Sequence, residues 1–249
     1  MRRARVVHAE SFWSTETAVG SLIDRDTMTR YEARGLRDCV ALAGGTSAVR
    51  RVGIVGIGAG RELPEIHAAL PDAEIVGWDI SEPMVDACRR RIADRSLDRC
   101  SAERGDVAEL RDGGPFDMLV AFNAALCYPQ PAGRRAAAFA NTAHLLRPGG
   151  VLMAVLQQRN ARPDWALWFA ARRAIRRIGL LRVDPDDHLS VLDGTAVPVH
   201  HYSPGELRRM AAEAGYAEVR IESIRAMGRR LGFAVPWRSP NPVVMTAIR

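Results

Sequence analysis

Apolar and polar positions alternate along the middle of the chain in blocks that predict strands and helices in turn. Short apolar runs have the length of buried strands at residues 52–55, 74–78, 118–122 and 151–156. Between these runs, apolar residues at helical spacing predict helices over residues 62–70, 82–94 and 133–146. Strands that alternate with helices predict an α/β fold, with a mostly parallel sheet and helices on both faces.

The segments on either side follow other patterns. A loose helical spacing predicts a helix over residues 27–42, which Gly44-Gly45 ends. Residues 159–201 are too long for a simple connection and contain a predicted helix over residues 164–181, so we expect an insertion over the sheet's binding edge. Ser203-Pro204-Gly205-Glu206 is a capping box for a helix that ends at Gly215. The closing strands are predicted at residues 217–224 and 243–248.

The length of 249 residues suits one elaborated α/β domain. We expect a single domain over residues 1–249, made of four consecutive parts. These are an N-terminal helical segment (1–45), a ligand-binding core (50–158), a lid-like insertion (159–202) and a closing helix with strands (203–249).

The composition excludes several kinds of chemistry. The formal net charge is +6, and the sequence contains no Lys, so every strongly basic side chain is Arg. A P-loop and a Schiff-base enzyme both need a Lys amine, and neither can be built here. The positive charge favours nucleic acid, an anionic membrane or acidic substrates, although a general preference for Arg explains it equally well.

Cysteine spacing and hydropathy bear on the compartment. Cys39, Cys88, Cys100 and Cys127 form no C-x-x-C pair and read as reduced thiols. The first residues are too polar for a signal peptide, and no apolar run approaches the roughly 20 residues of a spanning helix. We expect a cytoplasmic protein without a membrane span.

A glycine-rich turn follows the first predicted strand of the core. Gly56, Gly58 and Gly60 allow a tight turn and a close backbone approach to a ligand. Taken alone, such a turn is a weak signal. The dinucleotide fingerprint G-x-G-x-x-G needs its third glycine where Arg61 stands, which argues against NAD.

Two aspartates follow later elements of the core. Asp79 comes about 20 residues after the glycine turn, where a carboxylate can accept hydrogen bonds from both hydroxyls of a ribose. It can equally cap the following helix, for which Ser81 is a further N-cap candidate. Asp106 follows Gly105 and is either an acceptor for an adenine amino group or an ordinary turn residue.

Four stretches together resemble class I S-adenosylmethionine-dependent methyltransferases of the Rossmann-like superfamily. In chain order they are Gly56 to Gly60, Asp79-Ile80-Ser81-Glu82-Pro83-Met84, Gly105-Asp106 and Leu146-Arg147-Pro148-Gly149-Gly150. The likeness covers residues 31–156, and residues 202–248 are similar to the family's closing helix and antiparallel strands. The resemblance implies a seven-stranded sheet with an antiparallel closing strand and S-adenosyl-L-methionine as the cofactor.

The resemblance also implies roles for individual residues. Gly56, Ile57, Gly58 and Gly60 would lie against the methionine part, Asp79 would hold the ribose, and Ile80 and Met84 would flank the adenine. Asp106 and Val107 would read the adenine edge, and Asn123 would border both cofactor and acceptor. The family usually has an acidic residue two positions before the first glycine, where this chain has Ile54. The cofactor's ammonium therefore needs another partner.

Missing motifs narrow the acceptor. Asn123-Ala124-Ala125-Leu126 stands where members that methylate amides and exocyclic amines carry Asn-Pro-Pro-aromatic, so such acceptors are disfavoured. Asn123 and the lack of a His-Glu-x-x-His pattern give little support for a metal, and we expect none. Methyl transfer relies mainly on proximity, and a base is needed only if the acceptor atom is protonated.

The insertion carries most of the candidate acceptor-side residues. His200, His201 and Tyr202 are candidate catalytic residues, since a His titrates near neutrality; the two histidines are otherwise solvated or support the helix cap. Candidate substrate-binding residues are Trp165 and Trp168 in the insertion, with Tyr31 and Tyr128 outside it. The stripe of Trp165, Trp168 and Phe169 at helical spacing also arises from packing alone. The Arg residues at 172, 173, 176 and 177 form either a solvated helix face or a contact for RNA or a membrane.

These observations favour methylation of a small hydrophobic metabolite, of the kind made in secondary metabolism, at oxygen, nitrogen or carbon. Three alternatives stay open: an RNA methyltransferase that uses the Arg-rich helix, a non-methylating S-adenosylmethionine-binding protein, and an aminocarboxypropyl transferase. The expected partner is a small-molecule acceptor. Nucleic acid is disfavoured because no RNA-binding module accompanies the core, and a homodimer is left open.

Overall fold

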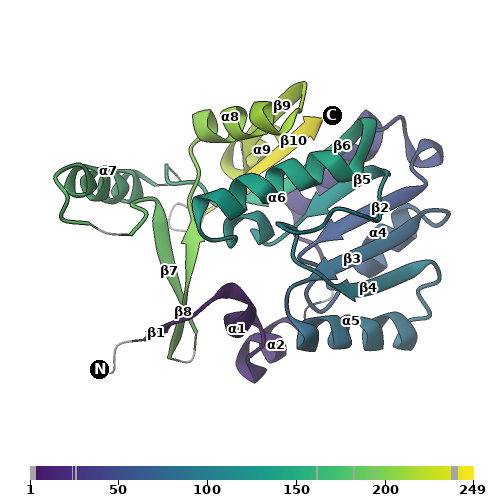
Figure 1. Ribbon diagram of the computed structural model, residues 1–249. Coiled ribbons are helices and arrows are strands. Elements are labelled where there is room, and N and C mark those ends of the chain that lie inside the picture. Colours follow the sequence, from purple (N-terminus) through teal and green to yellow (C-terminus); the bar gives the residue numbers. More distant parts are fainter. Residues whose placement is uncertain are drawn as a thin grey trace.

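The seven-stranded sheet predicted from the resemblance is present and confirms the α/β fold class. A computed structural model describes residues 4–23, 25, 27–160, 162–181, 183–192, 194–236 and 241–249. The strand order is β4-β3-β2-β5-β6-β10-β9 (Figure 1). In chain order these strands are β2 (Arg51–Val55), β3 (Glu74–Asp79), β4 (Cys100–Arg104), β5 (Phe116–Ala121), β6 (Leu146–Leu156), β9 (Glu218–Ser223) and β10 (Val243–Ile248).

Strand direction follows the predicted pattern. Strands β2 to β6 pair in parallel, whereas β10 is antiparallel to both β6 and β9. Strand β2 lies between β3 and β5, so the chain builds one side of the sheet and then returns to build the other. The carboxyl ends of such strands form a crevice at the reversal point, which is the usual ligand site of open α/β sheets.

Helices cover both faces of the sheet. One apolar core contains buried residues of α3 (Arg30–Leu42), α4 (Leu63–Ala69), α5 (Glu82–Asp94) and α9 (Ile224–Leu231). The other core contains buried residues of α6 (Ala132–Leu145) and α8 (Pro204–Ala214). The capping box predicted at Ser203 and Glu206 is present, and Ser81 is the N-cap of α5. Helix α9 was not predicted.

Short N-terminal helices precede α3. They are α1 (Ala9–Trp13) and α2 (Glu16–Ile23), which lie within the N-terminal segment but were not predicted as separate helices. Ser14 Oγ donates to Ser81 Oγ at 3.2 Å, and Ser81 Oγ donates to the Trp13 carbonyl at 3.1 Å. These bonds hold the N-terminal segment against the start of α5, beside the carboxyl edge of the sheet. Single-turn 3₁₀ helices lie at Thr46–Ala48 (η1) and Ala125–Cys127 (η2).

The insertion after β6 contains more than the predicted helix. Helix α7 (Pro163–Arg177) is followed by the antiparallel strands β7 (Asp187–Leu192) and β8 (Thr195–His200). Strand β1 (Arg5–Val6) pairs in parallel with β8 and completes a three-stranded sheet of order β1-β8-β7. Figure 1 shows this sheet and α7 to one side of the main sheet. None of the helices in the described ranges is long and apolar enough to cross a membrane.

Candidate functional site

A large cavity opens where the carboxyl ends of β2, β3, β4 and β5 meet the N-terminal segment and the insertion. Its volume is about 1620 Å³, whereas a single small-ligand pocket commonly measures roughly 300–1,000 Å³. One half is lined by the glycine turn after β2, and the other by residues of β7, β8 and α7. The cavity can therefore hold two ligands at once.

The glycine turn depends on the absence of side chains. Gly56, Gly58 and Gly60 all have positive φ angles, of 67°, 53° and 74°. A Cβ on Gly56 would come within 2.5 Å of the Ala125 side chain, and a Cβ on Gly60 within 2.7 Å of the Cys88 sulfur. Other residues would strain the turn or collide, so the turn keeps its backbone exposed to the cavity.

Asp79 organises this turn from the end of β3. Its Oδ2 accepts a hydrogen bond from the Gly58 amide at 2.9 Å, and its Oδ1 accepts from the Ser81 amide at 2.9 Å. Burial raises the pKa of Asp79, against the lowering effect of these backbone donors. The capping of α5 belongs to Ser81, whose Oγ accepts from the Met84 amide. Asp79 lines the cavity, and its carboxylate keeps acceptor capacity beyond these two hydrogen bonds.

Asp106 has the contacts of a turn residue and also lines the cavity. Its Oδ1 accepts from the Ala108 amide at 2.8 Å, as in a turn, while its Oδ2 accepts from Arg134 Nη2 at 2.6 Å. Arg134 also donates to Glu109 at 2.9 Å. Asp106 lies on the cavity wall with Ile80, Met84 and Val107, and an adenine amino group there would share the carboxylate with Arg134.

The turn after β5 is strained where it meets the cavity. Asn123 and Ala124 have φ angles of 47° and 61°. A left-handed conformation costs an alanine about 1–2 kcal/mol. Such strain concentrates at functional sites, and Asn123 lines the cavity between its two halves.

The insertion half of the cavity combines aromatic and apolar side chains with charged ones, among them Arg172, Arg176 and Asp187. Its wall includes Trp13, Tyr128, Trp168, Val197 and Pro198. The Trp13 and Tyr128 rings pack edge to face, with centroids 5.4 Å apart. The other two candidate aromatics are not part of this wall. Tyr31, in α3, packs against the apolar core. Trp165 stacks on His188, with ring centroids 5.8 Å apart.

The three candidate catalytic residues lie away from the cavity wall. His201 is buried among the rings of Trp165, Phe169 and His188. Burial lowers its pKa to about 4, and its Nδ1 has no hydrogen-bond partner within the described part of the chain. Tyr202 is fully buried and donates from its hydroxyl to the Leu126 carbonyl at 2.6 Å. The structure gives both side chains contacts that support the fold.

Two histidines that sequence reasoning missed do line the cavity. His188 lies at the start of β7, and His8 precedes α1. Partial burial, together with the Arg172 guanidinium, lowers the pKa of His188, which favours its neutral form. A neutral imidazole on the wall of a site is competent to accept a proton. Sequence reasoning missed His188 because no motif surrounds it.

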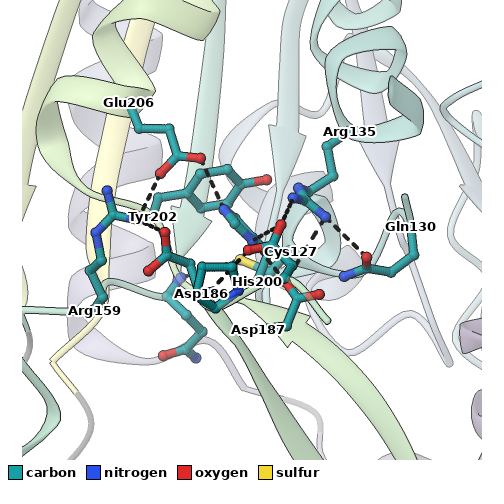
Figure 2. Close-up of polar contacts among 12 residues, drawn as sticks. Cys127, Gln130, Arg135, Arg159, Asp186, Asp187, His200, Tyr202 and Glu206 are labelled. Atoms are coloured by element: carbon teal, nitrogen blue, oxygen red, sulfur yellow. Dashed lines mark hydrogen bonds and ion pairs between the residues drawn. The ribbon is translucent and has the colours of Figure 1, made fainter. Parts of the chain in front are cut away.

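His200 belongs to a buried network of charges between the insertion and the core (Figure 2). Its Nδ1 lies 2.8 Å from Asp187 Oδ1, and its Nε2 lies 3.0 Å from Glu206 Oε1. Since both ring nitrogens face carboxylates, both must donate, and the side chain is an imidazolium. Burial lowers the pKa of His200, but the hydrogen bonds to Asp187 and Glu206 outweigh burial and raise it above its ordinary value.

Three guanidinium groups complete this network. Arg135 of α6 lies 2.7 Å from Asp184 Oδ2 and donates to Gln130 at 3.1 Å. Arg159 bridges Asp186 and Glu206, and Arg173 of α7 contacts Asp186 at 2.9 Å. Asp184, Asp187 and His200 have the spacing of a metal site. In this cluster, however, the cations beside the carboxylates are Arg135 and the His200 imidazolium, so we assign the network to the fold.

The titration of His200 predicts how stability depends on pH. Its folded pKa is raised, so its contribution to the free energy of unfolding is complete below the unfolded value of about 6.5 and is lost as pH rises through the folded pKa. We expect the stability difference between the parental protein and His200→Gln, measured by urea unfolding, to shrink as pH rises above about 6.5. A difference independent of pH there would show that the pKa of His200 is not raised by folding.

The Arg side chains of α7 mostly hold the insertion together. Arg172 donates to the carbonyls of Asp184, Pro185 and Asp187, and its guanidinium lies 4.6 Å from the centroid of the Trp168 ring. Arg173 pairs with Asp186, and Arg176 donates to the Leu181 carbonyl at 2.8 Å. These bonds use some of the guanidinium donors of α7 within the insertion.

Sequence comparison places the core of the chain among known proteins. Residues 52–150 match a protein family described as a methyltransferase domain. Over 98 residues the chain is 38% identical to a nocamycin O-methyltransferase from Saccharothrix syringae, which covers 39% of this chain. The match spans only about a third of that relative, 34% of its length.

Solved structures share the fold over nearly the whole chain. The CcbJ methyltransferase from Streptomyces caelestis superposes with a TM-score of 0.62 at 16% identity, covering 95% of this chain and 97% of its own. A magnesium protoporphyrin IX methyltransferase from Synechocystis, with bound S-adenosylhomocysteine, superposes with a TM-score of 0.60 at 15% identity. The match covers 96% of this chain and 97% of that one. An amino pentose methyltransferase from Micromonospora echinaspora superposes with a TM-score of 0.60 at 15% identity. The match covers 94% of this chain and 98% of that one.

Proposed function

The chain carries a class I, S-adenosylmethionine-dependent methyltransferase domain at residues 52–150, and from this premise we propose that it methylates a small, hydrophobic acceptor. The observation that carries the proposal is the two-part cavity of about 1620 Å³. Its glycine-turn half suits the nucleoside and amino-acid parts of the cofactor, and its apolar half suits an acceptor. When bound, the cofactor supplies an electrophilic methyl carbon on a sulfonium.

The described residues fit this cofactor at several points. The glycine turn leaves no side chain between the cavity and the backbone after β2. Asp79 offers a carboxylate for the ribose hydroxyls, and Ile80 and Met84 offer an apolar wall for the adenine. Proximity of the two ligands supplies most of the acceleration expected for a methyl transfer.

The aromatic side chains on the cavity wall support a hydrophobic acceptor. Trp168, Tyr128 and Trp13 line the cavity, and the cations Arg134, Arg172 and Arg176 on its wall already donate to groups within the protein. Aromatic walls with few free charges bind flat or apolar molecules. The similar nocamycin O-methyltransferase methylates an oxygen atom, as its name says, which supports an O-methyl product here. In that case His188 takes the proton from the acceptor hydroxyl.

The first test is binding of the cofactor. Asp79→Asn should weaken the binding of S-adenosylhomocysteine by about 1.5–3 kcal/mol, the scale of a hydrogen bond to a charged group. The neutral amide accepts less strongly from the ribose, and its NH2 cannot accept from the Gly58 or Ser81 amide that Asp79 now holds. Isothermal titration calorimetry measures the effect, and Asp94→Asn at the exposed end of α5 is a matched control. A parental protein that bound NAD in preference to S-adenosylhomocysteine would contradict the proposed function.

A further inference from the structure

A buried cluster of charges closes the glycine-turn half of the cavity. Arg61 Nη2 lies 2.8 Å from Glu32 Oε1, and Arg61 Nε donates to Glu62 Oε1 at 2.9 Å. Glu32 is 2% exposed and Glu62 is 5% exposed, so both carboxylates are removed from bulk water. Arg61 and Glu62 line the cavity, and Glu62 stands two residues after Gly60.

The cluster contains more negative than positive charge. One guanidinium serves two carboxylates, and the ion pairs described for Glu32 and Glu62 are both with Arg61. A buried charge without a full counter-charge is costly. Burial accordingly raises the pKa of Glu62, despite the nearby Arg61. The cluster is therefore a site that an additional cation would stabilise.

The two carboxylates differ in what they have left to offer. Glu32 Oε2 accepts from the amide and the hydroxyl of Thr29, at 2.8 and 2.7 Å, and so completes the N-cap of α3. Both oxygens of Glu32 are thus occupied. In contrast, the described contacts of Arg61 with Glu62 all fall on Oε1. Glu62 Oε2 has no described contact with Arg61, and Glu62 lines the cavity, so this oxygen is the one left to receive a cation.

We propose that Glu62, held in place by Arg61 and Glu32, receives the ammonium group at the amino-acid end of the bound cofactor. The inference rests on the proposed function, because that function brings an α-ammonium to the glycine turn. It also explains how the chain manages with Ile54, which is 1% exposed, lies in the apolar core and offers no acceptor. The acidic partner then lies at the N-cap of α4 and not in the strand before the turn.

Three ligands separate this role from a general role in folding. S-adenosylhomocysteine carries both the ammonium and the carboxylate, its decarboxylated analogue keeps only the ammonium, and 5′-methylthioadenosine has neither. We expect Glu62→Gln to weaken the first two by about tenfold or more, as for a lost hydrogen bond to a charged group. Its affinity for 5′-methylthioadenosine should stay at the parental value. The amide oxygen still accepts from Arg61, so the cluster keeps its shape.

Calorimetry of each protein with each ligand gives the dissociation constants. Glu82→Gln is the matched control, because Glu82 lies on the exposed start of α5, pairs with Arg89 and is not part of the cavity wall. That control should bind all three ligands as the parental protein does.

The outcomes distinguish the inference from the proposed function. Equal losses for all three ligands in Glu62→Gln would assign Glu62 to folding and overturn the inference. Unchanged affinity for S-adenosylhomocysteine would overturn it as well, and in both cases the proposed function stands. A parental protein that binds none of the three ligands would refute the proposed function and the inference together.

Discussion

Replacing His188 with Gln is expected to lower kcat by about 10²- to 10⁴-fold, the usual contribution of a positioned general base. The imidazole lines the acceptor half of the cavity, and its lowered pKa keeps it neutral and able to accept a proton. The base must be unprotonated to act, so activity should fall as pH decreases through a value below about 6.5. Initial rates across a pH series, with a hydroxylated aromatic acceptor, measure both effects.

His201→Gln is the matched control for this prediction. His201 has the same side chain but lies outside the cavity wall, in the aromatic cluster with Trp165 and Phe169. Its variant should keep the parental pH profile when assayed well below its midpoint of thermal unfolding. Comparable losses in both variants would show that the cluster acts through packing, and a parental rate in His188→Gln would exclude that residue as the base.

The second large effect is expected in stability. Arg135→Leu should lower the free energy of unfolding by about 3–5 kcal/mol, the cost of leaving a buried charge without its partner. Arg135 is 3% exposed, and its loss leaves the carboxylates of Asp184 and Asp187 with the His200 imidazolium as their remaining cation in the network. Urea unfolding followed by circular dichroism measures the change.

The neighbouring Arg134 provides the control. Its side chain is 40% exposed and pairs with Asp106 and Glu109, so Arg134→Leu should cost no more than about 1 kcal/mol. Adding Asp184→Asn to Arg135→Leu should recover part of the lost stability, because it removes one of the uncompensated charges. If Arg135→Leu and Arg134→Leu had the same free energy of unfolding, the network would contribute little to holding the insertion on the core.

Elements with strong local signals were predicted within a few residues. Helix α5 was predicted over residues 82–94 and spans Glu82–Asp94, because Ser81 caps it and its apolar positions recur at helical spacing. Strand β10 likewise spans the predicted residues 243–248. Both patterns depend on neighbouring residues only, so the sequence contains them in full.

Elements at the edges of the structure were missed. Strand β4 buries only Ala102 among its five residues, so no apolar run marks it. Strands β7 and β8 do carry a signal, since Leu189, Val191, Val197 and Val199 alternate with other residues around the dipeptide Asp193-Gly194. That dipeptide between alternating segments is typical of a hairpin. The hairpin was missed because the whole insertion was interpreted as a helical lid.

The sequence by itself determined the ligand edge of the sheet. Four residues lie at the carboxyl end of a strand or within two residues after it: Gly56, Asp79, Asp106 and Asn123. Parallel strands bring their carboxyl ends to one edge of the sheet. All four line the cavity, as their order along the chain implies. Their roles toward the cofactor stay predictions.

Only the tertiary structure decided which histidine faces the acceptor half. Asp187 pairs with His200 and His188 with Val199 in the hairpin register. Successive residues of a strand point to opposite faces, so neighbours along the chain meet different surroundings. His188 reaches the cavity, His200 meets carboxylates from β7 and α8, and His201 enters an aromatic cluster with α7. Register and long-range packing set these environments, and neither is encoded in a local pattern.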